Sequence, residues 1–64
     1  MLKISLKAAR VNAGLSQIDV CKALKKTPQT IVNWENGKTK IDYGNLETLC
    51  RLYNIDRKYI FLPY

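Results

Sequence analysis

The sequence contains no histidine and only two cysteines, Cys21 and Cys50, which stand far apart in a chain of 64 residues. General acid–base catalysis relies on histidine or on paired carboxylates, and the five acidic residues of this chain are scattered. Neither cysteine belongs to a C-x-x-C pair, so no common zinc site is indicated. We therefore expect a protein that is not an enzyme and uses no metal or cofactor, with the two thiols buried as small hydrophobic groups.

Long apolar runs are also missing. No stretch approaches the roughly 20 apolar residues that cross a bilayer, and charges interrupt the N-terminus every few residues, unlike a signal peptide. Acidic residues are few: the chain has five, against 11 lysines and arginines, and its formal net charge is +6. Such a basic surface favours a polyanionic partner, since binding releases counterions from phosphates. We expect a cytoplasmic protein without a membrane partner.

Residues that favour helix N-caps recur along the chain and open five segments with helical apolar spacing: Ser5, Ser16, Thr27, Asp42 and Asp56. Pro28 suits the first position of the third segment. Gly14 and Gly37 suit the left-handed ends of the first and third. Alternating strand patterns do not exceed three or four residues. The sequence predicts a single compact all-α domain of five helices over residues 1–64, with Leu6, Ala9 and Ala13 on the apolar face of the first.

Very few residues separate the second and third predicted helices. The second ends near Lys26, and the third begins at Pro28. Two helices joined by so short a connection must turn sharply, as they do in a helix-turn-helix motif. We place this motif at about residues 16–37.

Three segments of the chain resemble the lambdoid phage repressor and Cro family, also called XRE-type regulators: "RVNAGLSQIDVCKAL", "TPQTIVNWENGKTK" and "NLETLCRLYNI". The resemblance extends over residues 6–60. Its most specific matches are Leu15-Ser16-Gln17, Trp34-Glu35-x-Gly37 and Asn45-Leu46. The resemblance implies a repressor-like five-helix DNA-binding domain, in which the second helix of the motif enters the major groove.

In that family the base-reading residues lie at the start of the recognition helix, which here corresponds to Thr27, Pro28, Gln29, Thr30 and Asn33. The chemistry agrees, because the amides of Gln and Asn pair a donor and an acceptor with the N6/N7 edge of adenine. Gln29 and Asn33 are four residues apart and share a helix face. Trp34 is in helical phase with Ile31 on the opposite face, which favours packing over base stacking.

A second set of residues is expected at the DNA phosphates: Arg10, Gln17, Thr27, Lys38, Thr39 and Lys40. Contacts of this kind fix the register of a protein on DNA without reading the sequence. The resemblance gives Gln17 the further role of orienting Gln29. It also implies a partly buried structural ion pair between Arg10 and Glu35, which would tie the recognition helix to the first helix.

The predicted function is sequence-specific binding of double-stranded DNA by a phage or prophage repressor or Cro-type transcriptional regulator in a bacterial host. We expect a homodimer on a palindromic operator, weakly associated or monomeric in solution and associated with the nucleoid when bound. The alternative is an antitoxin-like protein-interaction module that autoregulates its operon. The apolar C-terminal segment "YIFLPY" fits either a partner surface or the docked end of the last helix.

Overall fold

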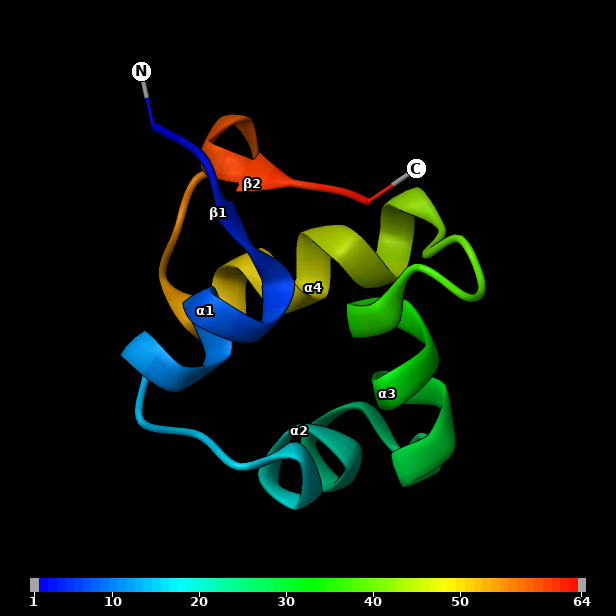
Figure 1. Cartoon of the computed structure of the whole chain (residues 1–64). Coiled ribbons are helices and arrows are strands. Elements are labelled where there is room, and N and C mark those ends of the chain that lie inside the picture. Colours follow the sequence, from blue (N-terminus) through cyan, green and yellow to red (C-terminus); the bar gives the residue numbers. More distant parts are fainter. Residues whose placement is uncertain (1, 64) are drawn as a thin grey trace.

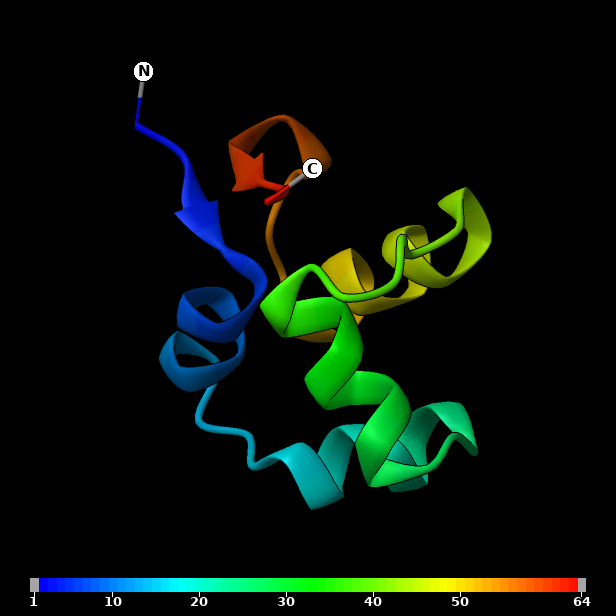
Figure 2. The same cartoon turned by 45° about the vertical axis from the view of Figure 1, so that its right-hand side comes forward.

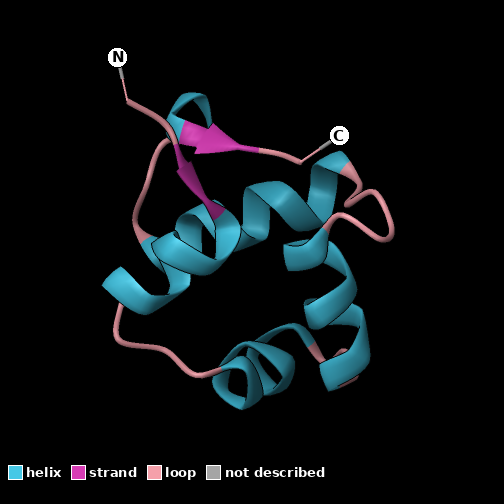
Figure 3. Ribbon diagram, viewed as in Figure 1, coloured by secondary structure: helices cyan, strands magenta, loops and turns pink. Residues whose placement is uncertain are grey.

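The computed structural model describes residues 2–63, which form four α-helices, one 3-10 turn and two very short strands (Figures 1 and 3). In chain order these are β1 (Ile4–Ser5), α1 (Leu6–Asn12), α2 (Gln17–Leu24), α3 (Pro28–Asn36), α4 (Tyr43–Tyr53), the 3-10 helix η1 (Arg57–Tyr59) and β2 (Ile60–Phe61). Figures 1 and 2 show both strands at the end of the molecule opposite α2.

Side-chain caps begin each helix, and the structure confirms all of the predicted N-caps: Ser5, Ser16, Thr27, Asp42 and Asp56. Ser16 and Asp19 form a reciprocal capping box. The N–H of Asp19 donates to Ser16 Oγ at 3.0 Å, and the N–H of Ser16 donates to Asp19 Oδ2 at 2.9 Å. The backbone hydrogen bond from Ser16 lowers the pKa of Asp19, and the side-chain hydrogen bond from Asn45 lowers the pKa of Asp42.

Left-handed residues end three of the helices. Gly37 ends α3 with a φ of 75°, a conformation that costs glycine little. Lys25 and Asn54 end α2 and α4 with φ values of 56° and 55°. Lysine takes up this conformation less readily than Gly or Asn does. At Lys25 the left-handed turn lets the chain enter α3 after only residues 25–27, which completes the predicted helix-turn-helix.

The predicted fifth helix is wrong. Asp56 accepts a hydrogen bond from the N–H of Lys58 at 3.0 Å, but only the single 3-10 turn of η1 follows. The chain then extends into β2, which pairs in parallel with β1 in the register Ile4↔Ile60 and Ser5↔Phe61. Pairing satisfies backbone groups of both strands and buries Ile60, which makes the extended path favourable. The fold is therefore mostly helical with a small parallel sheet.

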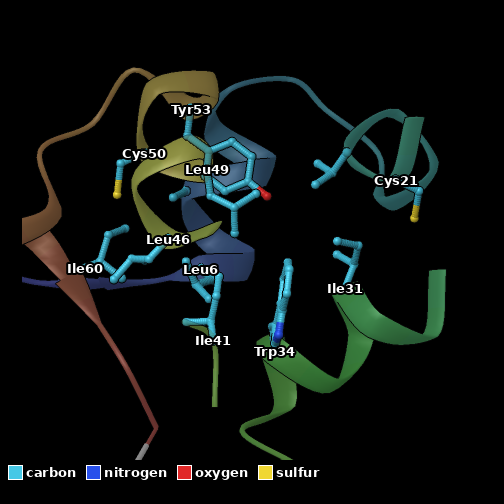
Figure 4. Packing of buried hydrophobic residues seen from close by; sticks show 12 residues of the cluster. Leu6, Cys21, Ile31, Trp34, Ile41, Leu46, Leu49, Cys50, Tyr53 and Ile60 are labelled. Atoms are coloured by element: carbon cyan, nitrogen blue, oxygen red, sulfur yellow. The ribbon is translucent and has the colours of Figure 1, made fainter. Parts of the chain in front are cut away.

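Twelve buried side chains from all four α-helices, the α3–α4 connection and β2 form one hydrophobic cluster (Figure 4): Leu6, Ala9, Val20, Cys21, Ile31, Trp34, Ile41, Leu46, Leu49, Cys50, Tyr53 and Ile60. Trp34 is 6% exposed, and Figure 4 shows it pointing from α3 into the cluster, which confirms the packing interpretation. Both cysteines are buried thiols, as predicted. Ala13, which was expected on the apolar face of the first helix, is exposed, and α1 ends at Asn12, one residue before it.

Candidate nucleic-acid interface

The N-terminal half of α3 carries the polar side chains that the sequence assigned to base reading. Thr27, Pro28 and Gln29 are exposed, and Thr30 and Asn33 are half-buried. The hydroxyls of Thr27 and Thr30 lie 3.0 Å apart within hydrogen-bonding distance. On the opposite face of α3, Ile31 and Trp34 are buried and fix the rotation of the helix, so that this polar face points outward.

Gln29 and Asn33 form a hydrogen-bonded amide pair on α3. Gln29 Nε2 donates to Asn33 Oδ1 at 2.9 Å. Each amide group has an oxygen that accepts and a nitrogen that donates. The oxygen of Gln29, its second N–H and the NH2 group of Asn33 stay outside this hydrogen bond, so the pair presents both an acceptor and donors on one helix face. That combination matches the acceptor and donor on the major-groove edge of adenine.

A buried ion pair joins α3 to α1. Arg10 Nε lies 2.7 Å from Glu35 Oε2, and the two side chains are only 9% and 4% exposed. The other Arg10 nitrogens are also engaged, with Nη1 donating to the Leu15 carbonyl at 3.0 Å and Nη2 reaching Glu35 Oε1 at 3.5 Å. Tyr53 packs nearby, and its burial, with the Glu35 charge as a lesser cause, raises the pKa of Tyr53 to about 12. Arg10 therefore belongs to the scaffold that holds α3, with all three guanidinium nitrogens hydrogen-bonded within the domain. Its contact with a DNA phosphate stays a prediction.

The lysine loop, residues 37–40, follows directly from the C-terminal end of α3. Lys38, Thr39 and Lys40 are all exposed. The N–H groups of Lys38 and Thr39 donate to the Asn33 carbonyl at 2.9 and 3.4 Å. Asn33 thus contacts Gln29 through its side chain and the lysine loop through its backbone. The polar and amide side chains thus lie on the outer face of α3, and the two lysines follow its C-terminal end.

The helix-turn-helix family model HTH_3, of the XRE/Cro/CI type, matches residues 6–60. The chain belongs to this family. Members of this helix-turn-helix family are DNA-binding transcriptional regulators without catalytic activity, and so is this protein. No match to the chain is found among curated proteins or among solved structures.

Gln17 has a different partner from the one that the resemblance implied. In this helix-turn-helix protein, Gln17 Nε2 donates to Glu35 Oε1 at 3.1 Å, and Gln29 donates to Asn33 instead. The structure gives the two amides separate partners, so Gln29 is oriented within α3 itself. Gln17 remains half-buried at the first position of α2, beside the N-terminal N–H groups of that helix. Its link to Glu35 makes the start of α2, the end of α3 and Arg10 of α1 one connected unit.

Sequence reasoning missed two contacts at the start of α4. Asn45 Nδ2 donates to Asp42 Oδ1, and the Arg57 guanidinium lies 4.3 Å from the centroid of the Tyr43 ring. The Asn45 contact had a local signal, because an amide three residues after an N-cap aspartate is within reach of it. Arg57 and Tyr43 belong to different elements, and no spacing rule relates them.

A membrane span and a metal site each require a physical pattern, namely helix length with apolar character and clustered ligands, respectively. Within residues 2–63, no helix has the length and apolar character needed to cross a membrane. In the same part of the chain, histidine, cysteine and acidic side chains do not gather into a group of three or more that could hold a metal ion.

Proposed function

We propose that this regulator is a repressor or Cro-type protein of phage or prophage origin, acting in the bacterial cytoplasm on the nucleoid. It places α3 in the major groove of a palindromic operator. The observation that carries this proposal is the hydrogen-bonded Gln29–Asn33 pair on the exposed face of α3, because a paired donor and acceptor is what base reading requires. Thr27 and Thr30 read through hydroxyl and methyl groups, and Pro28 contributes shape alone.

Phosphate contacts flank the reading surface on both sides. At one end of the site, Gln17 and Thr27 lie at the starts of α2 and α3, where backbone N–H groups and the helix dipole favour an anion. At the other end, the exposed Lys38, Thr39 and Lys40 follow α3. Contacts at both ends of the recognition helix set its depth and register in the groove.

The protein acts as a symmetric pair on DNA, with weak self-association or none in solution. A palindromic operator presents two half-sites one helical turn apart, about 34 Å, and one 64-residue subunit covers only one of them. A subunit with a net charge of +6 repels its copy in solution, and the phosphates between the half-sites relieve that repulsion when both are bound.

Selection from a random duplex library at moderate salt tests the proposed function. We expect the wild-type protein to enrich one site with dyad symmetry, because two identical recognition helices read two identical half-sites. Salt-sensitive binding without enrichment of any sequence would contradict sequence-specific regulation.

An antitoxin-like interaction module is the second candidate function, favoured by the exposure of two large apolar side chains, one in β2 and one two residues before β1. Leu2 is 90% exposed and Phe61 is 56% exposed. In that case a partner protein would change the hydrodynamic mass of the chain on mixing, whichever DNA site the selection enriches.

The salt dependence of operator binding should be steep. If each subunit neutralises about four or five phosphates, log K falls with log salt at a slope near −8 for the pair. Lys38→Gln with Lys40→Gln should make the slope shallower by about 3 to 4 units, because two phosphate contacts per subunit are lost. The matched control, Lys22→Gln with Lys25→Gln, removes the same charge from exposed positions in and after α2. Fluorescence anisotropy titrations measure all three slopes, and equal slopes for the two double variants would contradict a specific role of the loop.

A further inference from the structure

The C-terminal tail, residues 60–63, crosses the domain and ends beside the lysine loop. Its start is held by the pairing of β2 with β1 and by Ile60, which is 6% exposed. Leu62 is half-buried and packs against the hydrophobic cluster. In Figure 1 the described chain ends close to the connection between α3 and α4. Two anchored residues therefore fix the position of the residue that follows them, Pro63.

Pro63 packs against Gly37, the first residue of the lysine loop. A Cβ atom built on Gly37 would lie 2.7 Å from Cγ and 3.0 Å from Cβ of Pro63, which is closer than real side chains approach. Gly37 also has a φ of 75°, which side chains rarely adopt. Glycine is thus required at position 37 for two reasons, namely the left-handed end of α3 and the proline ring that covers it.

This contact lies next to the hydrogen bonds that shape the loop. The N–H of Gly37 donates to the Trp34 carbonyl at 3.3 Å, and the N–H of Lys38 donates to the Asn33 carbonyl at 2.9 Å. A ring stacked on Gly37 restricts motion that would open these two bonds. Pro63 is itself exposed, so the contact buries little apolar area and adds little to global stability.

We propose that Pro63 is a positioning residue for DNA binding, which holds the lysine loop against the end of α3 so that Lys38 and Lys40 meet the phosphates in a fixed geometry. The inference rests on the proposed function of that loop. A loop that is ordered before binding loses less conformational entropy on the DNA, so its contacts yield more affinity. Base reading by the start of α3 does not depend on Pro63, so the preferred sequence is independent of it.

Pro63→Gly in the full chain tests the proposal, with Phe61→Ala as the control. Phe61 belongs to the same tail and is 56% exposed, but its substitution leaves the ring over Gly37 in place. We expect Pro63→Gly to speed amide hydrogen exchange at Lys38 and Thr39 by about tenfold while exchange in α2 stays unchanged. Affinity for the site selected by the wild type should fall about three- to tenfold, with the same preferred sequence. Phe61→Ala should change neither quantity.

Each other outcome counts against the proposal. Unchanged exchange at Lys38, with or without weaker binding, would show that Pro63 does not hold the loop. Faster exchange with unchanged affinity would show that the order of the loop does not matter for DNA. If Pro63→Gly loosens every helix, Pro63→Ala, which keeps Cβ and removes the ring carbon nearest Gly37, replaces it under the same criteria. If the wild-type protein binds no duplex, the proposed function is overturned as well. If the wild type binds its site but Pro63→Gly changes neither the exchange nor the affinity, only this inference is overturned.

Discussion

Replacing Glu35 with alanine should cost about 3–5 kcal/mol of folding free energy, which is most or all of the stability of so small a domain. The variant leaves the Arg10 guanidinium buried without its carboxylate, since the side chain of Arg10 is 9% exposed. It also removes the acceptor for Gln17 Nε2. The loss of folding free energy is large because the buried Arg10 charge still has the cost of desolvation, and no opposite charge compensates for it.

Glu47→Ala is the matched control for this prediction. Glu47 pairs with Arg51 at 3.0 Å, but their side chains are 49% and 80% exposed, and the pair spans one turn of α4. Such a surface pair contributes no more than about 0.5 kcal/mol. Thermal melting followed by circular dichroism should show a fall of more than about 12 °C for Glu35→Ala and of only a few degrees for Glu47→Ala. Equal midpoints for the two variants would show that burial of the Arg10–Glu35 pair is unimportant.

The size of the Glu35 effect does not mean that the ion pair is itself strongly stabilising. Taking both charges out of water costs nearly as much as their attraction returns. Replacing both partners with apolar residues, Arg10→Met with Glu35→Leu, should therefore recover most of the midpoint lost in Glu35→Ala. The pair instead fixes geometry, because Glu35 receives Arg10 from α1 and Gln17 from α2 and so sets the position of α3 against both elements.

Local chemistry explains why so much of the fold could be predicted from the sequence. An N-cap side chain such as Ser16 bonds to a backbone N–H only three residues away, so its effect is contained in a short stretch of chain. The left-handed end of α3 at Gly37 also depends only on that residue and its immediate neighbours in the sequence. The helical phase of Ile31 and Trp34 likewise predicted which face of α3 is buried and which meets solvent.

Contacts between distant parts of the chain could not be predicted in this way. Strands of two residues, such as Ile4–Ser5, are too short to show alternation, and their partner lies at the other end of the sequence. The stacking of Pro63 on Gly37 depends on the path of that second strand.

At the candidate site, the helical phase of Ile31 and Trp34 predicted which face of α3 is turned away from the core, and contact of that face with bases stays a prediction. The partner of Gln17 was not predicted, because Glu35 lies on another helix 18 residues further along the chain and only packing brings the two side chains together.

Gln29→Ala should weaken discrimination at one base pair in each half-site of the operator. A good bidentate contact between an amide and adenine is worth about 1–3 kcal/mol, and two subunits double this to about 2–6 kcal/mol for the symmetric pair of positions. The substitution also removes the hydrogen bond that orients Asn33, so the loss should extend to a neighbouring base pair. Gln29 is exposed, and the folded state should keep its thermal midpoint within a few degrees.

Library selection with the wild type and Gln29→Ala in parallel measures this effect. The variant should enrich a site of the same dyad symmetry and spacing, in which one symmetric pair of positions has lost its preference and a neighbouring symmetric pair shows a weaker one. Lys22→Gln, which alters an exposed residue on α2 away from the amide pair, should enrich the wild-type site. Because the phosphate contacts of the variant are intact, its affinity for unrelated duplexes and its salt slope should match those of the wild type. A Gln29→Ala protein that selects the complete wild-type site would show that α3 reads DNA through other side chains.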